Sequence, residues 1–87
     1  MYTDDMSAPE EVTGLEAHPI DSGIVLEWAS AKGANMYEVY VEDDKVGETK
    51  LTNYTVEGLT NGQTYTFGVI AKNGAGSSSK ATVSGTP

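Results

Sequence analysis

The sequence predicts an all-β protein, a seven-stranded antiparallel Greek-key sandwich. Short segments with apolar residues at every second position follow one another along the chain, and none has a helical period. Turn-forming residues separate them at regular intervals. In residues 53–71, Tyr54 and Val56 lead through Leu59 to a polar turn, and Tyr65 opens a longer strand. We expect the Tyr65 hydroxyl to bond backbone between residues 59 and 62, as in a tyrosine corner.

The seven expected strands are residues 12–17, 24–28, 37–42, 45–49, 54–57, 64–73 and 80–86. The first contains Gly14, which suggests a bulge. Residues 18–23, His-Pro-Ile-Asp-Ser-Gly, are expected to form a turn. The second strand ends on Trp28, its heaviest inward residue.

The third strand alternates Tyr37 and its apolar neighbours with polar residues, and Asp43-Asp44 makes a tight turn into the fourth. The lysine and acids of that fourth strand suit an exposed edge that must not pair with another chain. The fifth and sixth strands flank the corner. Residues 73–78, rich in glycine and serine, are expected to form a flexible loop before the last strand.

Length and composition fit one small domain. The chain has 87 residues, enough for one core, and no cysteine, so the core must hold without disulfides. Residues 1–8 show no periodicity and are expected to be a flexible tail or linker, with the domain over residues 9–87. No signal peptide is recognisable at the start of this sequence.

The charge of the chain disfavours two classes of partner. The net charge is −8, with five lysines and no arginine. Nucleic-acid binding needs clustered basic residues along the phosphates, so this function is excluded, and anionic membrane surfaces are disfavoured for the same reason. No apolar run approaches the roughly 18 residues needed to cross a bilayer. The acidity favours a soluble monomer.

The order of the key residues resembles a fibronectin type III domain, an immunoglobulin-like sandwich. The resemblance covers residues 9–87 and rests on Pro9, Val12, Trp28, Tyr37-x-Val39, Tyr54-x-Val56, Leu59, Tyr65, Ala71-x-Asn73 and Gly76-Ser77. It implies structural roles for Trp28, Tyr37, Leu59 and Tyr65. The Arg-Gly-Asp tripeptide of some animal members is missing, because the matching loop reads Asn-Gly-Ala-Gly-Ser.

The same resemblance suggests a setting for the domain. Residues 37–47, with their very short hairpin, are similar to modules of secreted bacterial polysaccharide-degrading enzymes and of bacteriophage tail proteins. This implies a place outside the cell or on a virion surface.

Four patterns invite a chemical interpretation, and each has a simpler structural one. His18, Asp21 and Ser22 have the residue types of a hydrolytic triad but sit on one expected turn without a pocket. The pairs Asp43-Asp44 and Glu10-Glu11 lack the spacing of a calcium loop. Residues 74–80 lack the spacing and helix of a phosphate loop. Residues 53–55 fit the N-glycosylation pattern, which matters only in a eukaryotic secretory pathway.

The strongest candidate for a contact surface lies on the outer face of one sheet. Strand alternation turns Tyr40, Gly68 and Ile70 outward, with Tyr40 beside Gly68. Tyr40 either covers the bare backbone of Gly68 or forms a small patch for a neighbouring domain, protein or sugar ring. Asn73 and Gly74 in the following loop are the second candidate. The other sheet should carry an acidic stripe of Glu16, Glu27 and Glu57.

Together these patterns predict a non-catalytic spacer or accessory module of a larger extracellular or virion-surface protein. The alternative is a weak binder of cell-surface carbohydrate or protein. We expect neighbouring domains of the parent chain as its partners, no cofactor or metal, and no enzymatic activity.

Overall fold

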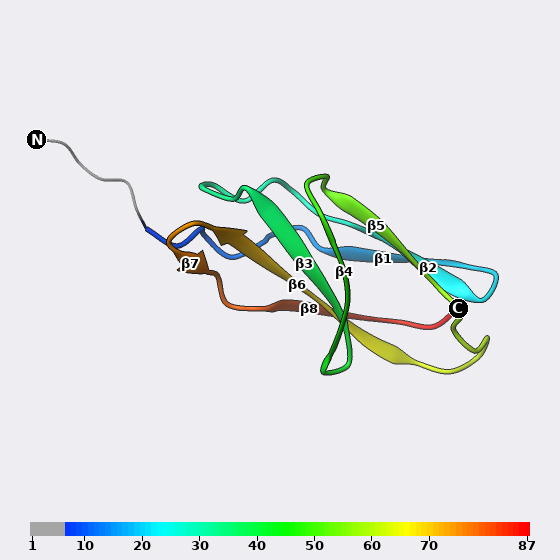
Figure 1. Cartoon of the computed structure of the whole chain (residues 1–87). Helices are drawn as coiled ribbons and strands as arrows, with labels where there is room; N and C mark the ends of the chain where they lie inside the picture. Colours follow the sequence, from blue (N-terminus) through cyan, green and yellow to red (C-terminus); the bar gives the residue numbers. More distant parts are fainter. Residues whose placement is uncertain (1–6) are drawn as a thin grey trace, which may run out of the picture.

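The computed structural model describes residues 7–87 and contains eight strands and no helix in that range (Figure 1). The strands are β1 Glu16–Ile20, β2 Gly23–Glu27, β3 Met36–Val41, β4 Asp44–Thr49, β5 Asn53–Glu57, β6 Tyr65–Asn73, β7 Gly76–Ser77 and β8 Ala81–Gly85. No helix that could cross a bilayer occurs in this part of the chain. The tail expected over residues 1–8 lies mostly outside the described residues.

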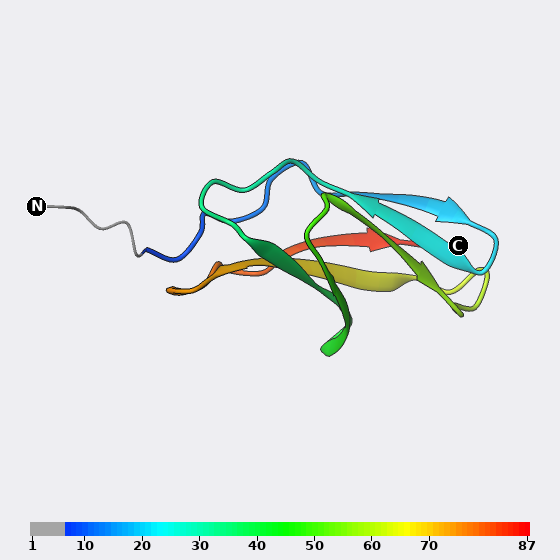
Figure 2. The ribbon, with the colours of Figure 1, turned by 45° about the horizontal axis from the view of Figure 1, so that its top comes forward.

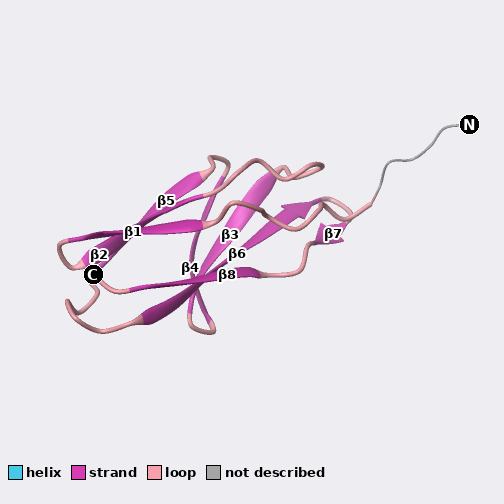
Figure 3. Cartoon of the chain, turned by 180° about the vertical axis from the view of Figure 1, so that it is seen from behind, coloured by secondary structure: helices cyan, strands magenta, loops and turns pink. Residues whose placement is uncertain are grey.

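Two antiparallel sheets form the sandwich, as predicted. One has the order β1-β2-β5, and the other has the order β4-β3-β6-β7, with β8 also paired to β6. Seen from behind, the two layers run along each other over their length (Figure 3). Contacts of β1 with β8 and of β4 with β5 join the two sheets at their sides.

The core lies between the inward faces of both sheets. Ile24 and Leu26 of β2 meet Val39 of β3 and Phe67 and Val69 of β6, and all five side chains are fully buried. Their every-second-position spacing is the pattern from which the strands were predicted, and it places one apolar face of each sheet inward.

The first strand begins later than predicted. Residues 18–20 were expected to turn, but they belong to β1, and only Asp21 and Ser22 form the turn. Val12 and Thr13 instead run beside the segment after β2, where the Thr13 carbonyl accepts a bond from the Ala29 amide. Gly14, at φ +68°, separates this segment from β1. A left-handed glycine ends regular strand geometry, which explains the shift.

The loop after β6 is more ordered than predicted and gives the eighth strand. β7 pairs with the end of β6, joining Lys72 to Ser77 and Asn73 to Gly76. The Asn73 side chain accepts bonds from the amides of Ala75 and Gly76 at 2.7 and 3.1 Å. An asparagine that bonds the backbone two and three residues on is a local turn device, so this segment is a tight hairpin.

The described chain enters and leaves at opposite ends of the sandwich (Figure 2). At the entry, the Ser7 carbonyl accepts a 2.7 Å bond from the side chain of Asn73. At the exit, the Pro87 carbonyl accepts a 3.0 Å bond from the amide of Gly62. Ser7 and Pro87, the first and last described residues, are thereby tied to loops of the domain.

Candidate functional site

The tyrosine corner is present and joins the fifth and sixth strands. The Tyr65 hydroxyl accepts a 2.9 Å bond from the amide of Thr60, within the predicted stretch. The Tyr65 ring is half-buried beside Leu59. The corner therefore lies at the edge of the core.

Trp28 and Tyr37 close the core at the other end. Both are buried, and their rings meet edge to face with centroids 5.4 Å apart. The Tyr37 hydroxyl accepts a 3.0 Å bond from the amide of Ala31, in the loop after β2. Here a second tyrosine ties a loop to the core, in a buried setting that the sequence alone did not reveal.

The predicted patch around Tyr40 is covered by a lysine. Tyr40 pairs with Gly68 in the register of β3 and β6, and Tyr40 and Ile70 are half-buried. A Cβ on Gly68 would lie 2.5 Å from Cδ of Lys80, so the Lys80 stem covers the bare backbone. The nearest atoms to this position belong to Lys80 and Ala81 and not to Tyr40. The Lys80 ammonium lies 4.6 Å from the centre of the Tyr40 ring, a cation–π contact.

A network centred on Glu38 occupies the same outer face. The Glu38 carboxylate accepts bonds from Lys72 at 3.0 Å, Lys45 at 3.1 Å and the Tyr40 hydroxyl at 3.2 Å. Lys45 also pairs with Glu48. Three of the five lysines of this acidic chain lie on this face: Lys45 and Lys72 bond Glu38, and Lys80 lies over Tyr40.

In this network the pKa of Glu38 is lowered and the pKa of Tyr40 is raised. Partial burial acts to raise the pKa of Glu38, but the bonds and charges of Lys72 and Lys45 outweigh it and hold the pKa below its ordinary value. Burial and the adjacent Glu38 charge raise the pKa of Tyr40. Both shifts keep Glu38 ionised and Tyr40 neutral at neutral pH, which is the pairing that the hydrogen bonds require.

Asn73 and Gly74 lie beyond the Tyr40 patch, at the hairpin of β6 and β7. Both the oxygen and the nitrogen of the Asn73 side-chain amide form hydrogen bonds. The nitrogen donates to the carbonyl of Ser7 and, at 3.0 Å, to the carbonyl of Gly33. Gly74 is exposed, with open space around it. Asn73 thus holds the entry of the chain, and the structure does not join this loop to the Tyr40 patch as one surface.

The three residues with triad chemistry do not form a triad. Asp21 and Ser22 bond to Asn61, whose side chain accepts from the Ser22 amide at 2.8 Å and donates to Asp21 at 2.9 Å. His18 lies on β1 instead, with its ring nitrogen 3.2 Å from Glu16 and 3.4 Å from Glu27. The turn residues fasten β1–β2 to the corner loop, and the histidine belongs to the acidic stripe.

Within residues 7–87, this stripe provides the single group of three side chains close enough to share a metal ion, namely Glu16, His18 and Glu27. All three are exposed. The expected pairs Asp43-Asp44 and Glu10-Glu11 do not gather a third ligand in the described structure. Residues 74–80 form the β7 hairpin and lead into a strand, not into the helix that a phosphate loop requires.

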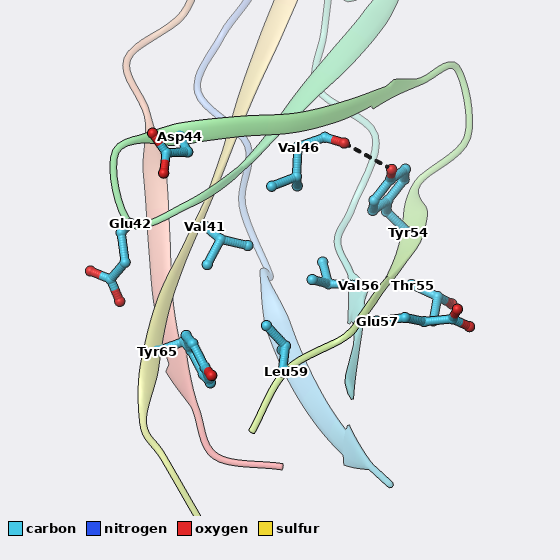
Figure 4. Close-up of a pocket in the computed structure, with 10 residues that line it drawn as sticks. All are labelled: Val41, Glu42, Asp44, Val46, Tyr54, Thr55, Val56, Glu57, Leu59 and Tyr65. Carbon is cyan, nitrogen blue, oxygen red and sulfur yellow. Dashed lines mark hydrogen bonds between the residues drawn. The ribbon is translucent and has the colours of Figure 1, made fainter. Parts of the chain in front are cut away.

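An open groove between β4 and β5 was missed by sequence reasoning (Figure 4). It has a volume of about 310 Å³ and ten lining residues: Val41, Glu42, Asp44, Val46, Tyr54, Thr55, Val56, Glu57, Leu59 and Tyr65. Its interior is apolar, with Val46 42% exposed and Tyr54, Leu59 and Tyr65 half-buried. Glu42, Asp44 and Glu57, all exposed, supply its charges, and no lysine lines it.

A bulge in β4 shapes one end of this groove. The register jumps from Val39 opposite Gly47 to Tyr40 opposite Lys45, which leaves Val46 as the extra residue. A Cβ on Gly47 would lie 2.1 Å from the Tyr54 hydroxyl, so only glycine admits the ring there. The hydroxyl donates a 3.3 Å bond to the Val46 carbonyl. Gly47 in an expected edge strand was the one sequence signal for this irregularity.

Comparisons with known proteins agree with the fold. A family model described as fibronectin type III domain matches residues 7–85. The chain belongs to the fibronectin type III family. The crystal structure of FN3tt superposes with a TM-score of 0.89 at 31% identity, over 93% of this chain and 96% of that one.

The curated relatives are bacterial enzymes of which this fibronectin type III module matches a small part. Chitinase Chi52 of Paenibacillus xylanexedens is 37% identical over 94% of this chain and 16% of its own length. Chitinase D of Niallia circulans is 40% identical over 74% of this chain and 13% of its own length. The structure of chitinase ChiA74 from Bacillus thuringiensis, at 24% identity and a TM-score of 0.83 over 99% of this chain and 14% of that one, shows the same fold.

Proposed function

We propose that this fibronectin type III domain is a non-catalytic spacer that sets the distance and angle between its neighbours in a larger extracellular glycan-degrading enzyme. The observation that carries the proposal is that the described segment is bonded to the domain both where it enters and where it leaves. Ser7 is held by Asn73 at one end, and Pro87 is held by Gly62 at the other. A domain fixed at both ends transmits orientation, which a flexible linker does not.

The enzymatic setting is supported by the relatives. Chitinases and an exoglucanase carry the similar segments, each as a minor part of a longer chain. Their names imply polymeric glycans, which are too large to enter a cell, so the parent of this module acts outside it. These relatives favour an enzyme over a virion as the parent.

A spacer and a binding accessory can be separated in the full-length parent enzyme. One variant replaces residues 9–87 with a flexible Gly/Ser linker, and another replaces them with an unrelated rigid domain whose ends lie similarly far apart. We expect both to keep activity on soluble oligosaccharides. On the insoluble polymer, the flexible variant should lose activity and the rigid one should recover it. If only the enzyme with its native module is active on the insoluble polymer, and the rigid replacement is not, a binding role would be favoured.

A further inference from the structure

We propose that the groove between β4 and β5 binds a protonated amino-sugar unit of a partly deacetylated glycan. The proposal rests on the glycan-degrading setting proposed above but adds a ligand and a site to it. The groove differs from the Tyr40 patch, because Lys80 lies over the Tyr40 ring whereas no lysine lines the groove.

The interior of the groove suits a sugar ring. Tyr54 and Tyr65 contribute half-buried rings, and Val46 and Leu59 add apolar surface between them. Sugar rings have an apolar face that packs on aromatic and aliphatic groups. The volume of about 310 Å³ lies near the lower end of the range of roughly 300–1,000 Å³ for small-ligand sites, so one or two sugar units fit.

The charges of the groove select a cation. Glu42, Asp44 and Glu57 line it without a lysine to neutralise them. The carboxylates of these three residues do not gather within metal-sharing distance of one another in the described structure. Charges spread around an apolar interior suit an organic cation, in which an ammonium group is carried on a ring, better than a bare metal ion.

The groove is held open by the fold and does not depend on a ligand to form. Tyr54 is fixed by its bond to Val46 and its packing on Gly47, and Tyr65 is fixed by its bond to Thr60. Glu42 is positioned by a 2.8 Å bond from the Thr66 amide to its carboxylate. Side chains that are already ordered lose little entropy on binding.

The test is a titration of the folded chain, followed residue by residue by NMR, with the glucosamine tetramer and the N-acetylglucosamine tetramer. The titration is run at about pH 6, above the ordinary pKa range of carboxyl groups. We expect the deacetylated tetramer to shift the groove residues with a millimolar dissociation constant that weakens with salt, and the acetylated one to bind several-fold more weakly.

Matched variants separate the groove from the general acidity of the chain. Asp44→Asn with Glu57→Gln should weaken binding about 5–10-fold, since each exposed ion pair contributes modestly. Asp43→Asn with Glu11→Gln removes the same charge from exposed positions outside the groove and should change affinity less than twofold. An equal loss of affinity in the two double variants would overturn the proposal and indicate unspecific charge attraction.

Three further results would overturn it. Tetralysine, of equal charge, could bind the groove as tightly, which would point to a basic peptide. The acetylated tetramer could bind as well as the deacetylated one, or neither could shift the groove at millimolar concentration. None of these outcomes tests the spacer proposal, which is tested by the rigid and flexible replacements. If the spacer test fails, binding to the groove can still be measured on this chain alone.

Discussion

The two ends of the sandwich are built from the same two devices in different surroundings. At each end a tyrosine hydroxyl accepts a bond from a loop amide: Tyr37 from Ala31 and Tyr65 from Thr60. At each end an asparagine side chain fastens a loop: Asn73 at the entry and Asn61 at the corner. At the entry end the tyrosine ring is sealed against Trp28, although a cavity of about 430 Å³ lies outside it beside Ser7 and Asn73. At the corner end the tyrosine itself lines the groove.

The two ends differ in how deeply their tyrosines are buried. Tyr37 is 5% exposed and packs on Trp28, whereas Tyr65 is half-buried beside Leu59. The same hydrogen bond therefore contributes more to stability at the sealed end, because its loss leaves a buried amide without a partner and without access to water. We therefore expect stability to concentrate around Trp28 and Tyr37, and the corner end, where the groove leaves surface for a ligand, to be the less stable one.

The largest expected effect is at the sealed end. Trp28→Ala should lower the free energy of unfolding by about 3–5 kcal/mol, because it empties the closed end of the core. Leu59→Ala at the open end should cost about 1–2 kcal/mol, because its side chain is already partly solvated. Urea denaturation checks both. Equal costs would mean that the two ends are equally sealed.

The paired tyrosines give the next and sharper test. Tyr37→Phe should cost about 1–3 kcal/mol, since the amide of Ala31 is left without its partner in a buried site. Tyr65→Phe should cost about 0.5–1 kcal/mol, since water reaches the exposed amide of Thr60. Each change keeps the ring, so the midpoint of urea denaturation reports the hydroxyl bond. A larger loss for Tyr65→Phe would reverse the comparison.

The corner end was predictable from sequence and the sealed end only in part. Spacing alone places Tyr65 six residues after Leu59, which is enough to expect its bond to the corner. The bond of Tyr37 to Ala31 depends on how the irregular loop after β2 folds over Trp28, and no local pattern encodes it. The groove likewise depends on a bulge at Val46, which the alternation of the sequence conceals.

The candidate contact surface shows the same limit. Alternation correctly paired Tyr40 with Gly68 across neighbouring strands. It could not show that Lys80, outside both strands, would cross Gly68 and reach the Tyr40 ring. Long lysine stems cover apolar surface wherever the fold brings them, and their paths follow from tertiary structure.

The two asparagines allow the loops at the two ends of the sandwich to be compared. Asn73→Ala should cost about 1–2 kcal/mol, since it removes the bonds to Ser7 and Gly33 and those from the amides of the β7 turn. Asn61→Ala should cost less than about 1 kcal/mol, since its two bonds lie at an exposed loop. Thermal unfolding of the two variants checks this order.

Spin labels check the consequence for the entry segment. Because the chain has no cysteine, Ser7→Cys and Ser84→Cys provide one labelled pair, and Thr55→Cys with Ser84→Cys provides a reference within the strands. Asn73→Ala should broaden the first distance distribution and leave the second unchanged. Asn61→Ala should broaden neither. If the distance distribution of the Ser7–Ser84 pair is already broad with Asn73 in place, the entry segment is not fixed.

The smallest expected effect lies between the two ends, at Glu38. Because its folded pKa is depressed below the ordinary 4.5, its contribution to stability is present above that value and is lost as pH falls through the folded pKa. The network is partly solvated, so the loss is modest. Glu38→Gln should flatten the acid limb of a plot of urea midpoint against pH, whereas Glu57→Gln, at an exposed position of β5, should not. Amide exchange in acid should then rise at Tyr40 and along β4 before it rises at Trp28 and Tyr37. Acid loss that begins at Trp28 and Tyr37 would show that the sealed end is not the most stable part of the domain.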